Sequence, residues 1–272
     1  MPLHPDGKTR LIALIGDPIS HARAPEFVNP ILLERGIDAY LIPLHVPKAD
    51  LASIVRMMPL ISNLCGLLVT IPHKEALAEI CDELGPHAKA TGAVNVVRFD
   101  PSGRLVGDIF DGTGMIESGR RNGIEVTGRK VLVVGTGGAG RAIAFALADA
   151  GVTRLGLANR TATRAEALAA DIRVLHSSLD VAAAGADATG WDVVVNATSL
   201  GLHAGDPMPL DPRSLDPSTD LIDIIAPRDT EIMDHARALG CRVIGGRPMI
   251  ECQFEDQMRF LRLEAAAADS GH

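Results

Sequence analysis

The chain lacks the features that mark membrane-spanning, secreted and nucleic-acid-binding proteins. Its first apolar run, residues 11–15, is far too short for a membrane span or a signal peptide. Lys and Arg form no block, and 26 of them against 34 Asp and Glu give a net charge of −8, which argues against nucleic acid or anionic membranes as partners. The four cysteines include no C-x-x-C pair, so we interpret them as reduced thiols of a cytoplasmic protein and expect no metal site.

What is present is the composition of a globular protein. The chain has 272 residues, 47% of them hydrophobic and 22% charged, which is enough for two domains with a sizeable core. In the first half, apolar runs that suit strands alternate with helical patterns. We expect strands over residues 11–15, 39–46, 65–72, 93–99 and 104–110, and helices over residues 24–36, 48–60 and 73–85.

The second half alternates more regularly between buried strands and helices. Its apolar runs are continuous, which is typical of parallel strands with both faces covered. The βαβαβ order predicts a doubly wound domain. We expect a strand, turn and helix over residues 129–151, strands over residues 154–160, 191–199, 220–227 and 241–246, and helices over residues 162–172, 231–240 and 248–267.

A glycine-rich turn joins the first strand of this half to its helix. Gly135, Gly137 and Gly140 form the pattern G-x-G-x-x-G, with Gly138 and Ala139 between the last two. The first glycine permits a tight turn, the second lets a pyrophosphate approach the backbone, and the helix N-terminus offers N–H groups to it. Because the pattern lies between a strand and a helix, we expect it to bind a dinucleotide.

The end of the next strand distinguishes between the two nicotinamide dinucleotides. Proteins that bind NAD usually carry Asp or Glu there, which accepts a hydrogen bond from the ribose 2′-hydroxyl. Here the strand ends in Asn159, Arg160 and Thr161, with Arg164 one helical turn further on and no acid among them. Two guanidinium groups can hold a 2′-phosphate through charge-assisted hydrogen bonds. The sequence therefore favours NADP, with NAD as the alternative.

Two residues at strand ends are candidates for proton transfer. Lys74 follows the strand expected over residues 65–72, and Asp111 follows the strand expected over residues 104–110. A partly shielded Lys can have its pKa lowered and act as acid or base, and a neighbouring Asp can orient a substrate hydroxyl. With NADP this pair suits the interconversion of an alcohol and a ketone, although spacing alone also fits a surface Lys and an Asp in a turn.

An ordered set of motifs resembles the shikimate dehydrogenase family over nearly the whole chain, from about Leu11 to Leu263. The family begins with a strand and a G-x-P-x-x-H loop, which GDPISH matches. The further motifs are VTIPHK, GAVNVV, GD..DGTG, VVGTGGAGRAIAFAL, ANRT, NATSLGL and GGRPMIECQ, in that order.

The resemblance implies an α/β fold with two domains. These are an N-terminal α/β substrate domain with a mixed sheet, residues 1–111, joined by the C-terminal helix, residues 249–272, and a Rossmann-type NADP domain, residues 112–248. The implied reaction is reversible oxidation of the ring 3-hydroxyl of shikimate or of related quinate. The implied catalytic pair is Lys74 and Asp111, the implied ring-hydroxyl contacts are Thr70, Asn95 and Gln253, and the implied cofactor contacts include Ala197, Thr198, Ser199 and Met249 besides the glycine turn and the residues that follow the next strand.

The departures from the family pattern all concern the substrate. The family's first loop typically reads H-S-x-S-P, and its two serines hold the substrate carboxylate, whereas this chain has Ala22 and Ala24 there. Two lost hydrogen bonds to a charged group weaken binding by roughly 3–6 kcal/mol, on the order of 10²–10⁴ in affinity. The other departures replace polar family residues by apolar ones: Leu68, Ile109, Phe110 and either Ile225 or Ala226.

Three functions remain open at this point. The first is an NADP-dependent dehydrogenase of this family whose substrate lacks the carboxylate or holds it through Arg23 or Arg247. The second is an ordinary shikimate dehydrogenase that tolerates these substitutions. The third is a dinucleotide-binding sensor without catalysis, against which the retention of Lys74 and Asp111 argues. For each we expect a small-molecule ligand and a monomer or homodimer.

Overall fold

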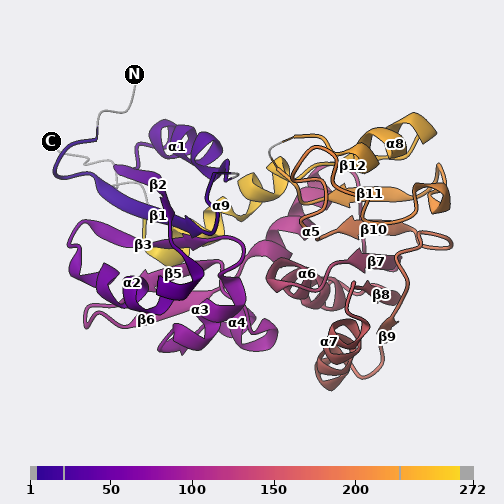
Figure 1. Ribbon diagram of the computed structural model, residues 1–272, viewed down its shortest axis with the longest axis horizontal. Helices are drawn as coiled ribbons and strands as arrows, with labels where there is room; N and C mark the ends of the chain where they lie inside the picture. Colours follow the sequence, from indigo (N-terminus) through magenta and orange to yellow (C-terminus); the bar gives the residue numbers. More distant parts are fainter. Residues whose placement is uncertain (1–4, 21, 227, 264–272) are drawn as a thin grey trace, which may run out of the picture. The chain divides into compact units, whose positions relative to one another are not determined.

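The chain forms two compact units, each with its own sheet. The computed structural model describes residues 5–20, 22–226 and 228–263. Unit 1 comprises Met1–Phe110 and Gln253–His272, and unit 2 comprises Asp111–Cys252. Helices and strands are interspersed in both units (Figure 1), which confirms the predicted α/β class.

The sheet of unit 1 has its strands in the order β2-β1-β3-β5-β6-β4. Strand β1 is parallel to β2 and β3, whereas β5 runs antiparallel to both β3 and β6, so the sheet is mixed. The strands are β1 (Arg10–Gly16), β2 (Ala39–His45), β3 (Leu64–Val69), β4 (Glu83–Leu84), β5 (Val96–Phe99) and β6 (Leu105–Asp108).

The reversed direction of β5 decides which residues meet. The carboxyl ends of β1, β3 and β6 and the amino end of β5 lie at one edge of the sheet. Thr70 donates its backbone N–H to Ile15 over 2.9 Å there, and Asn95 donates its own to Asp108 over 3.0 Å. Segments that are far apart in the sequence are thus brought side by side at this edge.

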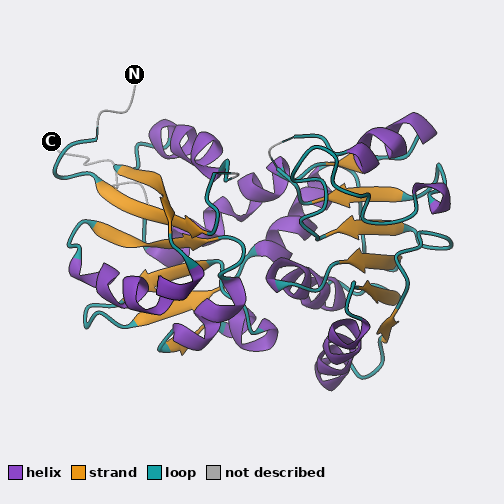
Figure 2. Cartoon of the chain, in the orientation of Figure 1, coloured by secondary structure: helices purple, strands orange, loops and turns teal. Residues whose placement is uncertain are grey.

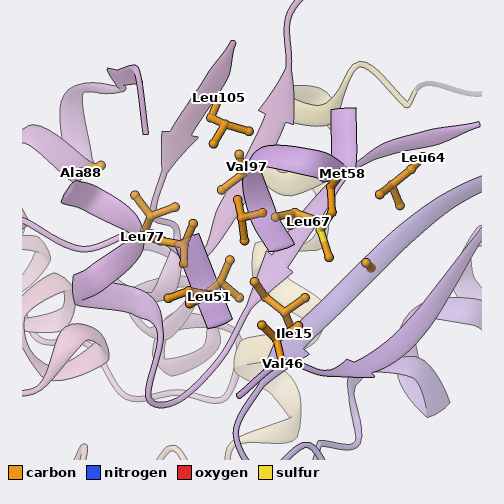
Figure 3. Close-up of a cluster of buried hydrophobic side chains, with 14 residues drawn as sticks. Ile15, Val46, Leu51, Met58, Leu64, Leu67, Leu77, Ala88, Val97 and Leu105 are labelled. Atoms are coloured by element: carbon orange, nitrogen blue, oxygen red, sulfur yellow. The ribbon is translucent and has the colours of Figure 1, made fainter. Parts of the chain in front are cut away.

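Helices cover both faces of this sheet. On one face, α2 (Leu51–Met57), α3 (Lys74–Ile80) and α4 (Pro86–Thr91) share a buried apolar cluster with the strands, which Figure 3 shows around Leu67 and Leu77. On the other face, α9 (Arg247–Leu261) lies so close to β3 that a Cβ on Gly66 would be 2.6 Å from the Leu261 side chain. The helix α1 (Ala24–Glu34) is tied to the outer strand β2, because Asn29 exchanges two hydrogen bonds with the backbone of Leu41, at 2.8 and 3.1 Å.

The helix predicted over residues 73–85 is shorter than expected. Helix α3 ends at Ile80, Cys81 is extended, and Glu83–Leu84 forms β4 beside β6. The backbone N–H groups of Asp82 and Gly85 donate to Leu105 and Gly107, both over 2.8 Å. The periodic pattern predicted too long a helix, because hydrogen bonds to a strand further along the chain outweigh the local helical preference of these residues.

The sheet of unit 2 is entirely parallel, with the order β12-β11-β10-β7-β8-β9. With the six strands numbered 1 to 6 along the chain and read from β9 to β12, this is the order 3-2-1-4-5-6 of a Rossmann-type domain, as predicted. Figure 2 shows these strands running alongside one another. They are β7 (Lys130–Val134), β8 (Arg154–Ala158), β9 (Asp180–Ala183), β10 (Val193–Asn196), β11 (Asp220–Asp223) and β12 (Val243–Ile244).

The helices of unit 2 follow from this order. Right-handed crossovers place α6 (Gly138–Asp149) and α7 (Ala162–Leu175) on one face and α8 (Glu231–Leu239) on the other. Buried side chains of α8, including Ile232 and Met233, pack on Leu132, Val194 and Leu221. The unit begins with α5 (Asp111–Arg121), which packs against α6 so tightly that a Cβ on Gly112 would lie 2.4 Å from the carbonyl oxygen of Ala142. Strand β9 was not predicted, because Val181 is its only buried residue.

Two further observations bear on the predicted elements. No helix in the described part of the chain is long and apolar enough to cross a membrane. The last helix, predicted over residues 248–267, corresponds to α9, and residues 264–267 lie outside the described ranges.

Candidate active site

Thr70 and Lys74 follow β3 at the edge of unit 1 where the strand ends gather. The Thr70 methyl group lies against Gly16, where a Cβ would come within 2.6 Å of it. Lys74 is the first residue of α3, and its carbonyl accepts from the backbone N–H of Val94 over 2.8 Å. The half-buried Lys74 is therefore held beside the segment that carries Asn95.

His73 anchors this segment from the inside. Its ring is fully buried, and Nε2 donates to the carbonyl of Val46 over 2.8 Å. Its Nδ1 has no hydrogen-bond partner among the residues that the structure describes. The burial of this histidine was not predicted, because a lone His beside a helix start gives no signal of burial.

Asn95 and Gln253 were both predicted as substrate contacts, and the structure brings them together. Asn95 Nδ2 donates to Gln253 Oε1 over 2.9 Å, and both side chains are buried. Gln257, one turn further along α9, donates to the same oxygen over 3.0 Å. Gln257 was not predicted, although its spacing of four residues from Gln253 on a helix was a usable signal.

The segment that precedes Asp111 is held by side-chain caps. Asp108 Oδ1 accepts from the backbone N–H groups of Ala88 and Ile109, at 2.8 and 2.9 Å. Phe110 donates its backbone N–H to Asn95 Oδ1 over 3.1 Å. Asp111 comes next in the chain as the first residue of α5 and of unit 2, and it is buried.

The apolar residues that replace polar family residues pack into the interior. The Phe110 ring makes edge contacts with His87 and Phe260, with ring centroids 5.7 and 5.9 Å apart. Ile109 and Leu68 are buried as well. These three positions therefore contribute packing in unit 1 and offer no side-chain hydrogen bond to a ligand. Ile225, in unit 2, is likewise buried.

The loop that follows β1 is anchored by Asp17. Its carboxylate accepts from His45 Nε2 over 2.8 Å and from the backbone N–H of Lys48 over 3.0 Å. The hydrogen bond from His45, followed by that from Lys48, holds the pKa of the Asp17 carboxyl below its usual value. The carboxylate therefore fixes the carboxyl ends of β1 and β2 to each other.

The later part of this loop carries no hydroxyl group. Ala22 and Ala24 are half-buried, and His21 lies outside the described residues. Arg23 is exposed and forms an ion pair with Glu26 at 2.5 Å, while Arg247 pairs with Glu251 at 2.8 Å. Both arginines considered as new carboxylate holders are thus already paired with acids.

The glycine turn of unit 2 has the geometry that its pattern predicts. Gly135 has φ +103°, in the region that favours glycine, and a Cβ there would lie 2.8 Å from Ala197. A Cβ on Gly140 would lie 2.0 Å from the Gly135 carbonyl oxygen, whereas one on Gly137 would meet no described atom within 4 Å. Gly138 and Ala139 begin α6, so their backbone N–H groups belong to its first turn.

Asn159 links this turn to the end of β8. Its Oδ1 accepts from the backbone N–H of Thr136 over 3.3 Å, and its Nδ2 donates to the Thr161 carbonyl over 3.0 Å. Arg160 and Arg164 are exposed on the segment that follows. The structure thus ties together the two segments predicted to hold the two ends of the adenosine phosphate moiety.

A hydrogen-bond network supports the ends of β10 and β11; Thr198 in it was predicted as a cofactor contact, whereas Asp223 and Thr230 were not predicted. Asn196 Oδ1 accepts from the N–H and hydroxyl of Thr198, at 3.1 and 2.7 Å. Asp223 accepts from the Ile225 N–H over 3.0 Å and from the Thr230 hydroxyl over 2.7 Å. Burial raises the pKa of the Asp223 carboxyl, against these hydrogen bonds and one from Asn196 that lower it. These contacts span only two to seven residues, and polar residues at strand ends gave no signal that they would be buried and paired.

The network borders the remaining predicted cofactor contacts. Ala197, Thr198 and Ser199 follow β10 directly, with Ser199 exposed and the other two half-buried. Met249 lies in the first turn of α9 and is buried.

The carboxyl edge of this sheet fits a dinucleotide. The space above Gly137 is open, α6 begins beside it, and the buried Thr136 hydroxyl has no partner among residues 5–20, 22–226 and 228–263. Ligands of doubly wound sheets bind where the strand order reverses, which here is between β7 and β10. No described group of three or more His, Cys, Asp and Glu could hold a metal ion.

Comparisons with known proteins agree with this geometry. Residues 14–97 match the model of the shikimate dehydrogenase substrate binding domain, and residues 118–239 match that of shikimate / quinate 5-dehydrogenase. A curated NADP-dependent shikimate dehydrogenase of Rubrobacter xylanophilus is 36% identical over 259 residues, which cover 93% of this chain and 91% of the relative.

Two solved structures extend the comparison. A shikimate dehydrogenase crystallised with NADP⁺ has a TM-score of 0.87 and 27% identity, covering 95% of this chain and 91% of that one. The 5-ketofructose reductase of Gluconobacter sp. strain CHM43 has a TM-score of 0.81 and 29% identity, covering 94% of each chain. The chain therefore belongs to the shikimate dehydrogenase family, and its curated relatives are NADP-dependent oxidoreductases that act on a CH–OH group.

Proposed function

We propose that the protein interconverts a secondary ring alcohol and its ketone with NADP, on a substrate that has no carboxylate against the loop that follows β1. The polar residues of the family pattern that handle the reacting alcohol are retained, namely Lys74, Asp111, Thr70, Asn95 and Gln253. Those that would hold a carboxylate are replaced by Ala22 and Ala24. The residues for the reaction are therefore retained in this chain, whereas those that select a carboxylate substrate are replaced.

Lys74 moves the proton in this proposal. Its ammonium group gives a proton to the ketone oxygen in reduction, and the amine takes it back from the hydroxyl in oxidation. Asp111 accepts a hydrogen bond from a substrate hydroxyl and orients the ring. The bound dinucleotide supplies or takes up the hydride. Thr70, Asn95 and Gln253 hold the neighbouring ring oxygens.

The cofactor contacts proposed in unit 2 follow from its sheet edge. Gly135, Gly137, Gly138, Ala139 and Gly140 would receive the pyrophosphate at the start of α6. A 2′-phosphate would be held by Asn159, Arg160, Thr161 and Arg164, and the nicotinamide would pack beside Ala197, Thr198, Ser199 and Met249. The network around Asn196 and Asp223 supports this last group by fixing the backbone after β10 and β11.

The state of the loop between Ala22 and Ala24 is the observation that carries the substrate proposal. It has no hydroxyl, and its one cation, Arg23, is exposed and paired with Glu26. Two missing hydrogen bonds would weaken carboxylate binding by roughly 3–6 kcal/mol, and desolvating the charge against methyl groups adds to this. A neutral substituent at this position avoids this loss of binding free energy.

A neutral polyhydroxy ketone is the substrate class that we favour. The structural neighbour named as a 5-ketofructose reductase would act on such a compound, and it shares the fold over 94% of both chains. The alternative is an ordinary shikimate dehydrogenase, as the curated relative is named. A sensor without catalysis is the third possibility, which the retained Lys74 and Asp111 disfavour.

Initial rates over a substrate panel decide among these possibilities. The panel contains shikimate and quinate with NADP⁺, neutral cyclic polyols with NADP⁺, and neutral polyhydroxy ketones with NADPH. We expect kcat/KM for a neutral compound to exceed that for shikimate at least tenfold. Shikimate kcat/KM of about 10⁴ M⁻¹s⁻¹ or more would establish the ordinary enzyme instead. If no compound is turned over, the sensor without catalysis is the remaining possibility.

A further inference from the structure

We infer that Gln257 is a positioning residue which fixes the amide of Gln253, so that Gln253 faces the substrate only as a hydrogen-bond donor. The inference rests on the proposed function for the identity of the ligand, but the orientation of the amide follows from contacts within unit 1. These contacts form one chain, from the backbone of Phe110 through Asn95 to Gln253 and Gln257.

This series of hydrogen bonds has a fixed donor-to-acceptor direction, because it begins at a backbone N–H group. Phe110 N–H can only donate, so the side-chain atom of Asn95 that it meets at 3.1 Å is the carbonyl oxygen. The NH₂ group of Asn95 therefore points the other way, toward Gln253. At 2.9 Å from it, only the carbonyl oxygen of Gln253 can accept. The backbone donor at Phe110 therefore sets the orientation of both side-chain amides.

Gln257 locks the second amide in this orientation. It lies one helical turn after Gln253 on α9, is buried, and donates Nε2 to the same Gln253 oxygen over 3.0 Å. That oxygen thus receives two N–H donors, which fills its two lone pairs. Turning the Gln253 amide over would break both hydrogen bonds and set its NH₂ group against two others in a buried place.

The consequence is a constraint on the substrate. With its oxygen filled, Gln253 has only its NH₂ group left to offer, so the ligand atom that meets it must accept. A hydroxyl, carbonyl or ether oxygen fulfils this condition, whereas an ammonium group, which has no lone pair, does not. Gln257 never touches the ligand in this scheme; it fills the second lone pair of the Gln253 oxygen and reinforces the amide orientation that Asn95 sets.

Two variants of Gln257 separate this role from a packing role. Q257L removes the donor, and Q257E replaces it by a group that donates only when protonated. With the best substrate of the panel, Q257L should raise KM about tenfold, which corresponds to about one net hydrogen bond, and leave kcat and the KM for NADP unchanged. Q257E should match the parent protein at low pH, and at high pH its KM should be at least as high as that of Q257L, because the carboxylate can only accept and repels the Gln253 oxygen. E255Q, on the same helix, removes only the exposed ion pair with Arg35 and should leave all of these constants unchanged.

A measurement without turnover tests the hydrogen bond from Gln257 to the Gln253 oxygen directly. In the ¹³C,¹⁵N-labelled full chain, the side-chain carbonyl resonance of Gln253 should move in Q257L and stay in place in E255Q. An unmoved resonance, or a pH-independent KM in Q257E, would overturn the role of Gln257. If no compound in the panel turns over, the proposed function fails, and the resonance still decides whether Gln257 donates to the Gln253 oxygen.

Discussion

The carbonyl oxygen of Gly135 occupies the space that a side chain at Gly140 would need, since a Cβ there would lie 2.0 Å from it. Gly137 differs, because a Cβ on it would meet no described atom within 4 Å and its φ is −75°, which any residue adopts. Positions 135 and 140 need glycine so that the strand β7 and the helix α6 can approach each other. Only a ligand would require glycine at position 137.

This contrast gives a matched pair of variants. G137A should fold with unchanged stability and raise the KM for NADP at least tenfold, because the methyl group enters the space proposed for the pyrophosphate. G140A should instead lower the melting temperature markedly, because its Cβ overlaps backbone. Thermal unfolding without cofactor and NADP titration of both variants check this. Unaltered NADP binding by G137A would contradict the assignment of the turn.

Restoring the two serines of the family pattern tests the substrate assignment. In A22S/A24S, KM for shikimate should fall by about 10²–10³, because two hydroxyl donors again meet the carboxylate, while the KM for NADP stays constant. Steady-state kinetics of the parent, both single variants and the double variant measure this. A double variant with the parent's shikimate KM would show that the loop does not contact the carboxylate.

Removing the side-chain amine of Lys74 tests the proton transfer. K74M should lower kcat by about 10²–10⁴ in both directions and leave NADP affinity intact, since general acid–base catalysis contributes on this scale. Lys89, an exposed residue of α4, provides the control variant K89M, which should behave as the parent. Equal activities of K74M and the parent on every substrate would favour the sensor.

Charge removal at Arg160 and Arg164 tests the choice of dinucleotide. R160A/R164A should raise the KM for NADP at least tenfold and change that for NAD little, since only NADP carries the 2′-phosphate. The nearby R173A, which loses a hydrogen bond of 2.7 Å to the Val181 carbonyl, controls for changes in α7 and β9. If the parent already prefers NAD, the role given to the two arginines is wrong.

The pH dependence of stability offers a prediction at Glu117. Hydrogen bonds from Arg120 and Arg121 lower the pKa of the Glu117 carboxyl to about 2. Because the folded pKa lies below the unfolded one, this contribution is present above about pH 4.5 and is lost as the pH falls toward 2. Urea unfolding of E117Q should show a loss of about 1 kcal/mol at pH 7, given the partial exposure of the pairs. The loss should shrink to roughly half or less at pH 3, and a loss that stays constant between these values would contradict the assignment.

Local pattern predicted the frame of the fold well. The strand, turn and helix around Gly135 and the parallel sheet of unit 2 follow from continuous apolar runs and one glycine pattern, both of which are local properties. The end of α3 at Ile80 and the short strand β4 were missed, because they depend on hydrogen bonds to β6 that no local window contains.

The same limit applies to the site. Family resemblance named Asn95 and Gln253 separately, but their hydrogen bond joins positions 158 residues apart and appears only when α9 packs on the sheet. Asp223 and Thr230 are only seven residues apart and were missed as well, because their contact depends on how the chain passes from β11 into α8. Residues that act on ligands through other residues leave little trace in a sequence.

The return of the last helix to unit 1 has a consequence for the order in which the protein can assemble during synthesis. Unit 2 is one uninterrupted stretch of chain, Asp111–Cys252, and can fold as soon as that stretch has left the ribosome. Unit 1 begins the chain, yet its core lacks Phe254, Met258 and Leu261 until α9 has been made. The half of the enzyme that is translated first is thus the half that is completed last.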